Sequence, residues 1–66
     1  MTGFKIRLGE TDITTTVFTS SMVFDLIYGV MLDETMAVEA SSWSEVASVG
    51  DIYEADLFTV EVIWLM

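Results

Sequence analysis

The sequence predicts a single small α+β domain over residues 1–66, with two helices on one face of a small, mostly antiparallel sheet. Three observations lead to this fold class. Residues 4–8 alternate between apolar and basic side chains, residues 22–32 are apolar with helical spacing, and residues 57–66 are apolar on both faces of a strand. The hydrophobic fraction of 53% exceeds the globular average of roughly 45–50%, which favours a folded chain over a disordered one. We predict the element order β-β-α-β-α-β.

The first 19 residues predict a β-hairpin. In Phe4–Leu8, apolar residues alternate with Lys5 and Arg7, which is typical of a half-buried strand. Gly9–Asp12 supplies turn residues. Ile13–Thr19 is almost entirely β-branched or aromatic, and such side chains fit a pleated surface.

Met22–Leu32 predicts a helix that is apolar nearly all round. The two serines before it can cap its free amides. At 100° per residue, Val23, Ile27 and Val30 share the core-facing side, and Asp25 marks the opposite side. A pair of buried strands is the alternative for this segment. Three apolar side chains lie beside Asp25, on the side that should face water: Met22, Tyr28 and Leu32.

A strand and a second helix are predicted next. Met36–Ala40 alternates like a short strand. Ser42 and Glu45 have the spacing of a capping box, which predicts the start of a two-turn helix. Gly50 is placed to end that helix.

The last sixteen residues predict an acidic connector and a buried strand. Asp51–Asp56 is the connector. Leu57–Met66 is mainly apolar on both faces, so we expect it to be a central strand of the sheet.

The charge pattern is the strongest functional signal. The formal charge is −9, both bases lie within the first seven residues, and every charged residue after Arg7 is acidic. Soluble surfaces ordinarily interleave the two signs. We therefore expect a surface of spaced carboxylates that attracts a basic groove on a nucleic-acid-binding protein. Acidity that serves solubility alone is the alternative. The expected contact residues fall at element ends and connectors: Asp33, Glu34, Glu45, Asp51, Glu54 and Asp56.

Composition excludes several other functions. Without Cys or His, the chain has no disulfide, zinc-thiolate or imidazole chemistry. A charge of −9 argues against direct binding of nucleic acid. We predict no enzyme activity, no catalytic residue and no cofactor. Weak divalent-cation binding at Asp51, Glu54 and Asp56 is a lesser alternative, but the EF-hand pattern is missing, so no metal site is predicted.

The surplus of apolar residues predicts association with another protein surface. Met22, Tyr28 and Leu32 exceed what one small core can bury, and exposed apolar patches mark interfaces. We expect a homodimer through the helix or an edge strand. The longest apolar run is interrupted by Asp25 and is shorter than a membrane span, so no membrane partner is expected.

In size, acidity and lack of Cys and catalytic residues, the chain resembles the small acidic inhibitors encoded by bacteriophages and mobile elements, including anti-CRISPR proteins and other DNA mimics. Val38–Ala47 also resembles the strand-cap-helix unit of small phage-borne β-α-β domains. The resemblance implies a non-enzymatic inhibitor in the bacterial host cytoplasm. Its partner would be a basic nucleic-acid-binding protein of a host defence system. A small structural or regulatory subunit that dimerises or docks through an apolar face is the alternative.

Overall fold

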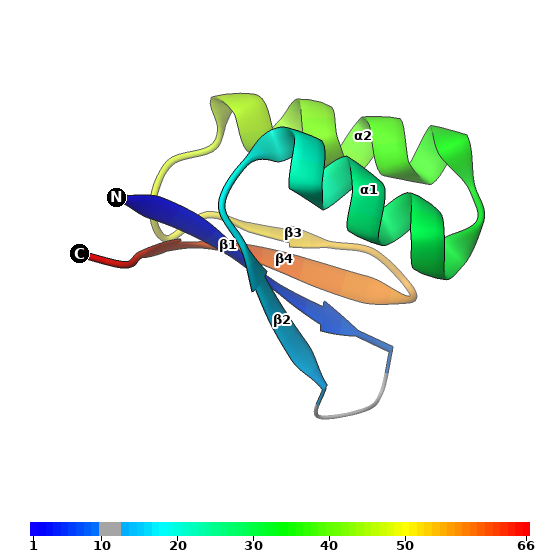
Figure 1. The fold of residues 1–66 in the computed structure, drawn as a ribbon, viewed down its shortest axis with the longest axis horizontal. Helices are drawn as coiled ribbons and strands as arrows, with labels where there is room; N and C mark the ends of the chain where they lie inside the picture. The colour runs from blue at the N-terminus through cyan, green and yellow to red at the C-terminus, as the bar shows by residue number, and fades with distance from the viewer. Residues whose placement is uncertain (10–12) are drawn as a thin grey trace.

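The computed structural model describes residues 1–9 and 13–66, and their elements follow the order β-β-α-α-β-β (Figure 1). The α+β class and the two helices on one face of an antiparallel sheet are confirmed, whereas the predicted order of the middle elements is wrong. The elements are β1 (Thr2–Leu8), β2 (Thr14–Val17), α1 (Ser20–Met31), α2 (Glu34–Val46), β3 (Ile52–Glu54) and β4 (Phe58–Trp64).

The sheet has the strand order β2-β1-β4-β3, and all neighbours are antiparallel. The first hairpin is confirmed as the β1–β2 pair. Gly9 follows β1 with a φ of 62°, and residues 10–12 of the predicted turn lie outside the described residues. The prediction of a central C-terminal strand is also confirmed, because β4 lies between β1 and β3.

Pairing of β1 with β4 joins the two ends of the chain. The register runs from Thr2 opposite Trp64 to Leu8 opposite Phe58. Beyond the strand, the Leu65 amide donates to the Met1 carbonyl at 2.8 Å. The two termini accordingly lie side by side in Figure 1.

The middle of the chain differs most from the prediction, because α2 replaces the predicted strand Met36–Ala40 and the predicted helix start at Ser42. The Asp33 carboxylate accepts a hydrogen bond from the Met36 amide at 3.0 Å, so this residue is the N-cap. Met36 and Ala40 are one helical turn apart, and they share a side in a helix as well as in a strand. Their spacing therefore did not distinguish the two structures.

Three smaller predictions are also corrected. Thr19, and not a serine, caps α1, because its hydroxyl accepts from the Met22 amide at 3.1 Å. Helix α2 ends at Val46, and Gly50 instead lies in a turn with a φ of 98°. The turn is closed by the Asp51 amide, which donates to the Ser48 carbonyl at 2.9 Å. The predicted acidic connector contains β3.

The core fills the space between the helices and the inner face of the sheet (Figure 1). Val23 and Ile27 of α1 are fully buried, as predicted. Val30, predicted on the same face, is instead 48% exposed. Two buried alanines of α2 leave room for close packing, and the sheet contributes the largest share of the core: Phe4, Ile6, Val17, Phe58, Val60 and Val62.

The two candidate starts of α2 give opposite expectations for stability. Replacing Asp33 by Ala removes the observed cap and should lower the free energy of unfolding by about 1 kcal/mol, whereas Asp33→Asn retains an acceptor and should cost much less. Ser42 is an exposed residue inside the helix, so Ser42→Ala should be neutral or stabilise by a few tenths of a kcal/mol. Urea unfolding followed by circular dichroism measures all three. A large loss with Ser42→Ala and none with Asp33→Ala would contradict a helix that begins at Glu34.

Candidate functional site

The structure separates the predicted contact residues instead of gathering them on one surface. Asp33 and Asp56 border the same hollow of about 320 Å³, between the start of α2 and the β3–β4 turn, and Glu39 borders it too. Glu45 borders a second hollow with Asp25, between the start of α1 and the end of α2. Asp33 and Asp56 thus border one hollow, and Glu45 borders another.

Two of the predicted contact residues hold the backbone in place. The Asp33 carboxylate caps α2, as described above. The Asp51 carboxylate accepts from the Ser48 amide at 2.9 Å and thereby braces the turn before β3. Glu34 lies in the first turn of α2, where a negative charge favours the positive end of the helix dipole. These carboxylates are exposed, so their charge remains available to a partner.

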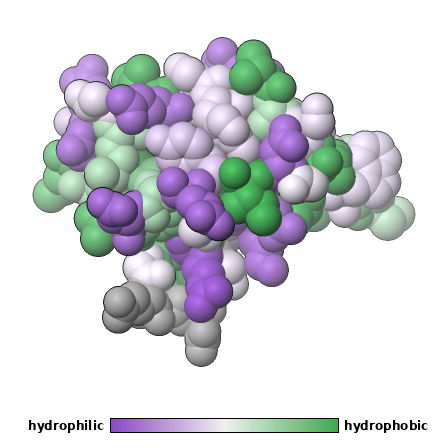
Figure 2. Space-filling model, turned by 180° about the vertical axis from the view of Figure 1, so that it is seen from behind, coloured by the Kyte–Doolittle hydropathy of each residue, from purple (hydrophilic) through white to green (hydrophobic). Residues whose placement is uncertain are grey.

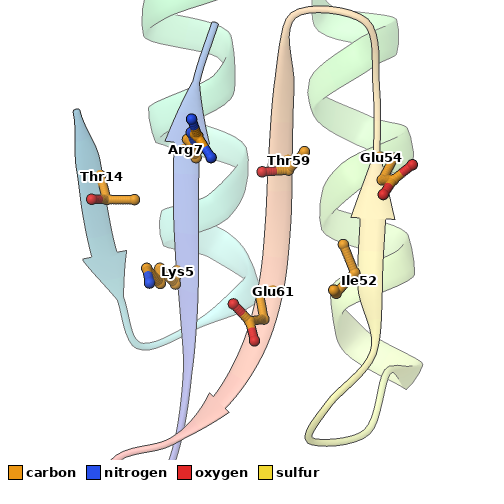
Figure 3. A pocket seen from close by; sticks show the side chains of 7 residues that line it. All are labelled: Lys5, Arg7, Thr14, Ile52, Glu54, Thr59 and Glu61. Carbon is orange, nitrogen blue, oxygen red and sulfur yellow. The ribbon is translucent and has the colours of Figure 1, made fainter. Parts of the chain in front are cut away.

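The outer face of the sheet carries both bases (Figure 3). Lys5 and Arg7 project from β1 on the side away from the helices. In the strand register, Lys5 lies directly opposite Glu61 of β4, and Arg7 lies between Thr14 and Thr59. Together with Ile52 and Glu54 they line a hollow of about 380 Å³.

Among the described residues, this face is close to neutral in charge, because two carboxylates, Glu54 and Glu61, accompany the two bases. Opposite charges directly across from each other stabilise a strand pair. Of the predicted contact residues, Glu54 borders the same hollow as Lys5 and Arg7. Glu61 was not predicted as part of this face. Side chains alternate along β4, so Glu61 lies on the face opposite to the buried Phe58 and Val60.

The helix layer, by contrast, carries acids only. Residues 20–46 contain five carboxylates and no base. Asp25 and Glu39 belong to this acidic layer, and neither was predicted as a contact residue. The predicted contact residues were selected at element ends and in connectors, whereas Asp25 and Glu39 lie inside α1 and α2, so that criterion did not include them. The five acids are Asp25, Asp33, Glu34, Glu39 and Glu45.

Apolar side chains interrupt the polar surface. Figure 2 shows hydrophilic and hydrophobic groups interspersed on the face seen from behind Figure 1. On α1, the predicted interface residues Met22, Tyr28 and Leu32 are all exposed, Leu32 to 79%. The Tyr28 ring stacks on Phe24 with 5.8 Å between the ring centres. Exposed apolar side chains thus lie close to the acids of the helix layer.

Leu32 ends α1 in an unusual conformation. Its φ is 54°, in the left-handed region, and its amide donates to the Tyr28 carbonyl at 2.9 Å. Glycine and asparagine ordinarily occupy such helix ends, because a larger side chain costs roughly 1–2 kcal/mol there. The chain places a strained and exposed leucine at a position that stability alone would give to glycine.

Within residues 1–9 and 13–66, no three acidic residues are gathered so that they could hold a metal ion, and Asp51, Glu54 and Asp56 are not such a group. No helix among these residues has the length and hydropathy needed to cross a bilayer.

Self-repulsion in the Asp33–Glu39–Asp56 hollow gives a prediction about stability. Glu39→Gln removes one of three neighbouring negative charges and should raise the free energy of unfolding by a few tenths of a kcal/mol at low salt. The gain should disappear at high salt, because screening already weakens the repulsion. Urea unfolding at low and high NaCl measures this. Glu61→Gln is the matched control, since Glu61 lies opposite Lys5 and its neutralisation should give no gain. An equal gain in both variants would show that net charge matters and position does not.

The left-handed backbone conformation of Leu32 gives a second prediction about stability. Leu32→Gly relieves the backbone strain and should raise the free energy of unfolding by about 1 kcal/mol. Thermal or urea unfolding measures the difference. Leu32→Ala is the control, because it shortens the side chain but keeps the strain. If Ala stabilises as much as Gly, exposure of the leucine and not its conformation carries the cost.

Comparison of the chain with protein-family models, with curated proteins and with solved structures gives no match. Function is therefore inferred from the charges and contacts of the chain itself.

Proposed function

We propose that the chain is a non-enzymatic inhibitor that docks its acidic helix layer into the basic groove of a nucleic-acid-binding defence complex in a bacterial host cytoplasm. The observation that carries this proposal is the segregation of charge. Both bases lie on the outer face of the sheet, and residues 20–46 of the helix layer carry five acids and no base. The molecule therefore presents one nearly neutral face and one acidic face.

The acids of α2 are spaced along a rigid axis. Glu34 and Glu45 are eleven residues apart, which corresponds to about 16 Å along the helix and to nearly the same side of it. Glu45 borders a hollow with Asp25 of α1, so this side of α2 faces the neighbouring helix. Carboxylates held in this way can pair with lysines and arginines that otherwise hold phosphates.

Charge segregation also orients the encounter. A basic groove attracts the whole chain through its charge of −9, and the attraction is strongest for the face that lacks cations. Such steering raises the association rate and suppresses docking through the face of Lys5 and Arg7. Because the helices are packed on the sheet before binding, little ordering cost is expected.

A structural or regulatory subunit that docks through an apolar surface is the second candidate. It is favoured by the exposed Tyr28 and Leu32, and by the strained backbone of Leu32. Strained conformations concentrate at functional surfaces. In this function the acids serve solubility, and binding would depend on apolar contact.

The test is displacement of a fluorescent target duplex from a purified Cas9-type effector loaded with guide RNA. Wild-type chain should compete with the duplex, and its inhibition should weaken as NaCl rises. Glu34→Gln with Glu45→Gln removes two acids of the helix layer and should weaken inhibition about tenfold, which is roughly 1.4 kcal/mol.

The matched control is Glu54→Gln with Glu61→Gln, which removes the same charge from the sheet face. It should inhibit nearly as well as the wild type. Equal loss in both double variants, or inhibition that does not change with salt, argues against docking through the helix layer. Loss of binding with Tyr28→Ser and Leu32→Ser alone favours the subunit.

A further inference from the structure

Strand β2 leaves one edge of the sheet open. In an antiparallel pair, alternate residues direct their backbone groups toward the neighbouring strand. The Leu8 amide donates to the Ile13 carbonyl at 3.3 Å, which fixes the phase of the β1–β2 ladder. Thr15 and Val17 therefore face β1 with their amide and carbonyl, and Thr14 and Thr16 direct theirs outward.

Strand β2 carries neither charge nor proline, two of the features that prevent strand pairing. Proteins protect edges with charged residues, prolines, bulges or very short strands, and of these β2 has its length of four residues. Strand β2 reads Thr-Thr-Thr-Val, which is uncharged and fully β-branched, and the chain has no proline. Edge strand β3 contains Glu54 and is flanked in the sequence by Asp51 and Asp56, whereas β2 itself holds no acid and Asp12 precedes it by two residues. The two edges of the sheet are thus treated differently.

We propose that a second copy of this chain pairs with β2 in antiparallel orientation, with the two-fold axis at Thr15. Thr14 of one copy then lies opposite Thr16 of the other, and each of these two pairs exchanges both backbone hydrogen bonds. The run of three threonines matches itself in this register, and Thr–Thr cross-strand pairs are favourable. The product is a continuous eight-stranded sheet with both helix layers on the same side.

Electrostatic repulsion between two copies of the chain favours their pairing through β2. Two chains of −9 repel, so they associate best where their acids are farthest apart. At β2 the adjacent strand is β1, which carries Lys5 and Arg7 and no acid. Pairing through β3 would instead bring two copies of the Asp51–Asp56 segment together. The seam between two β2 strands, residues 14–17 of each copy, is uncharged, and the β1 strands beside it carry Lys5 and Arg7.

The experiment is sedimentation velocity of the full chain from about 10 µM to about 1 mM, because a four-residue seam buries less than a standard interface. Wild type should shift from monomer to dimer, and the shift should strengthen with NaCl as repulsion is screened. Binding to a basic groove has the opposite salt dependence, so failure of one proposal does not imply failure of the other.

Thr16→Pro removes an outward amide without breaking the ladder to β1 and should abolish the dimer. Ile52→Pro is the matched control on the β3 edge. The hydrogen bond from the Ala55 amide to the Phe58 carbonyl fixes the phase of the β3–β4 ladder, so the Ile52 amide points away from β4. The Ile52→Pro variant should still dimerise. Circular dichroism checks that both variants fold.

Amide exchange of the wild type tests the same register without any variant. Protection of the Thr14 and Thr16 amides should rise with protein concentration, and that of Ile52 and Glu54 should not. A chain that stays monomeric at both low and high salt overturns the proposal. A dimer that survives Thr16→Pro, or one that protects other amides, overturns it as well and points to the exposed side of α1.

Discussion

The antiparallel pairing of β1 with β4 is the contact on which the rest of the structure depends. It joins residues from the two ends of the chain over seven consecutive pairs, and it places both longest strands at the centre of the sheet. Ile6 at the centre of β1 and Val60, which lies opposite it in β4, both face the helices. Without this pair, the two hairpins β1–β2 and β3–β4 would be separate ribbons, and a lone hairpin is only marginally stable.

The same register decides where the charges lie. Because side chains alternate along a strand, a register that buries Ile6 and Val60 must expose Lys5 and Arg7 on the outer face. It also sets Glu61 directly opposite Lys5, whereas Arg7 lies between Thr14 and Thr59. Residues 20–46, which hold the two helices, contain no base. The uneven surface is thus a geometric consequence of strand alternation combined with a sequence whose bases are confined to β1.

The sequence predicted the strands whose local pattern is strong, either a strict alternation or a short apolar run. Phe4–Leu8 alternates strictly, and β4 is apolar on both faces, so both were identified as strands. A second helix was predicted, but its start was placed eight residues too late, because its first turns are ambiguous and because Ser42 and Glu45 imitate a capping box inside a longer helix. Asp33 was the available signal for its start. Strand β3 is three residues long, too short for any period, and is defined only by its pairing with β4. For the candidate site, the individual acids were identified from the sequence. Their grouping was not, because it depends on contacts between elements that are distant in the sequence.

The placement of uncharged strand β2 bears on what the acidity is for. Charge that serves solubility is most effective on an open sheet edge, where backbone pairing between molecules begins. The chain leaves that edge as three threonines and a valine, while residues 20–46 of the covering helices receive five carboxylates. It also retains Leu32, strained and exposed, among those carboxylates. A surface shaped by solubility alone would carry charge at both sheet edges and not at β3 only, and would have glycine or asparagine at the helix end. The observed pattern instead concentrates charge and exposed apolar contact on the helix layer, which is the arrangement expected of a surface that binds.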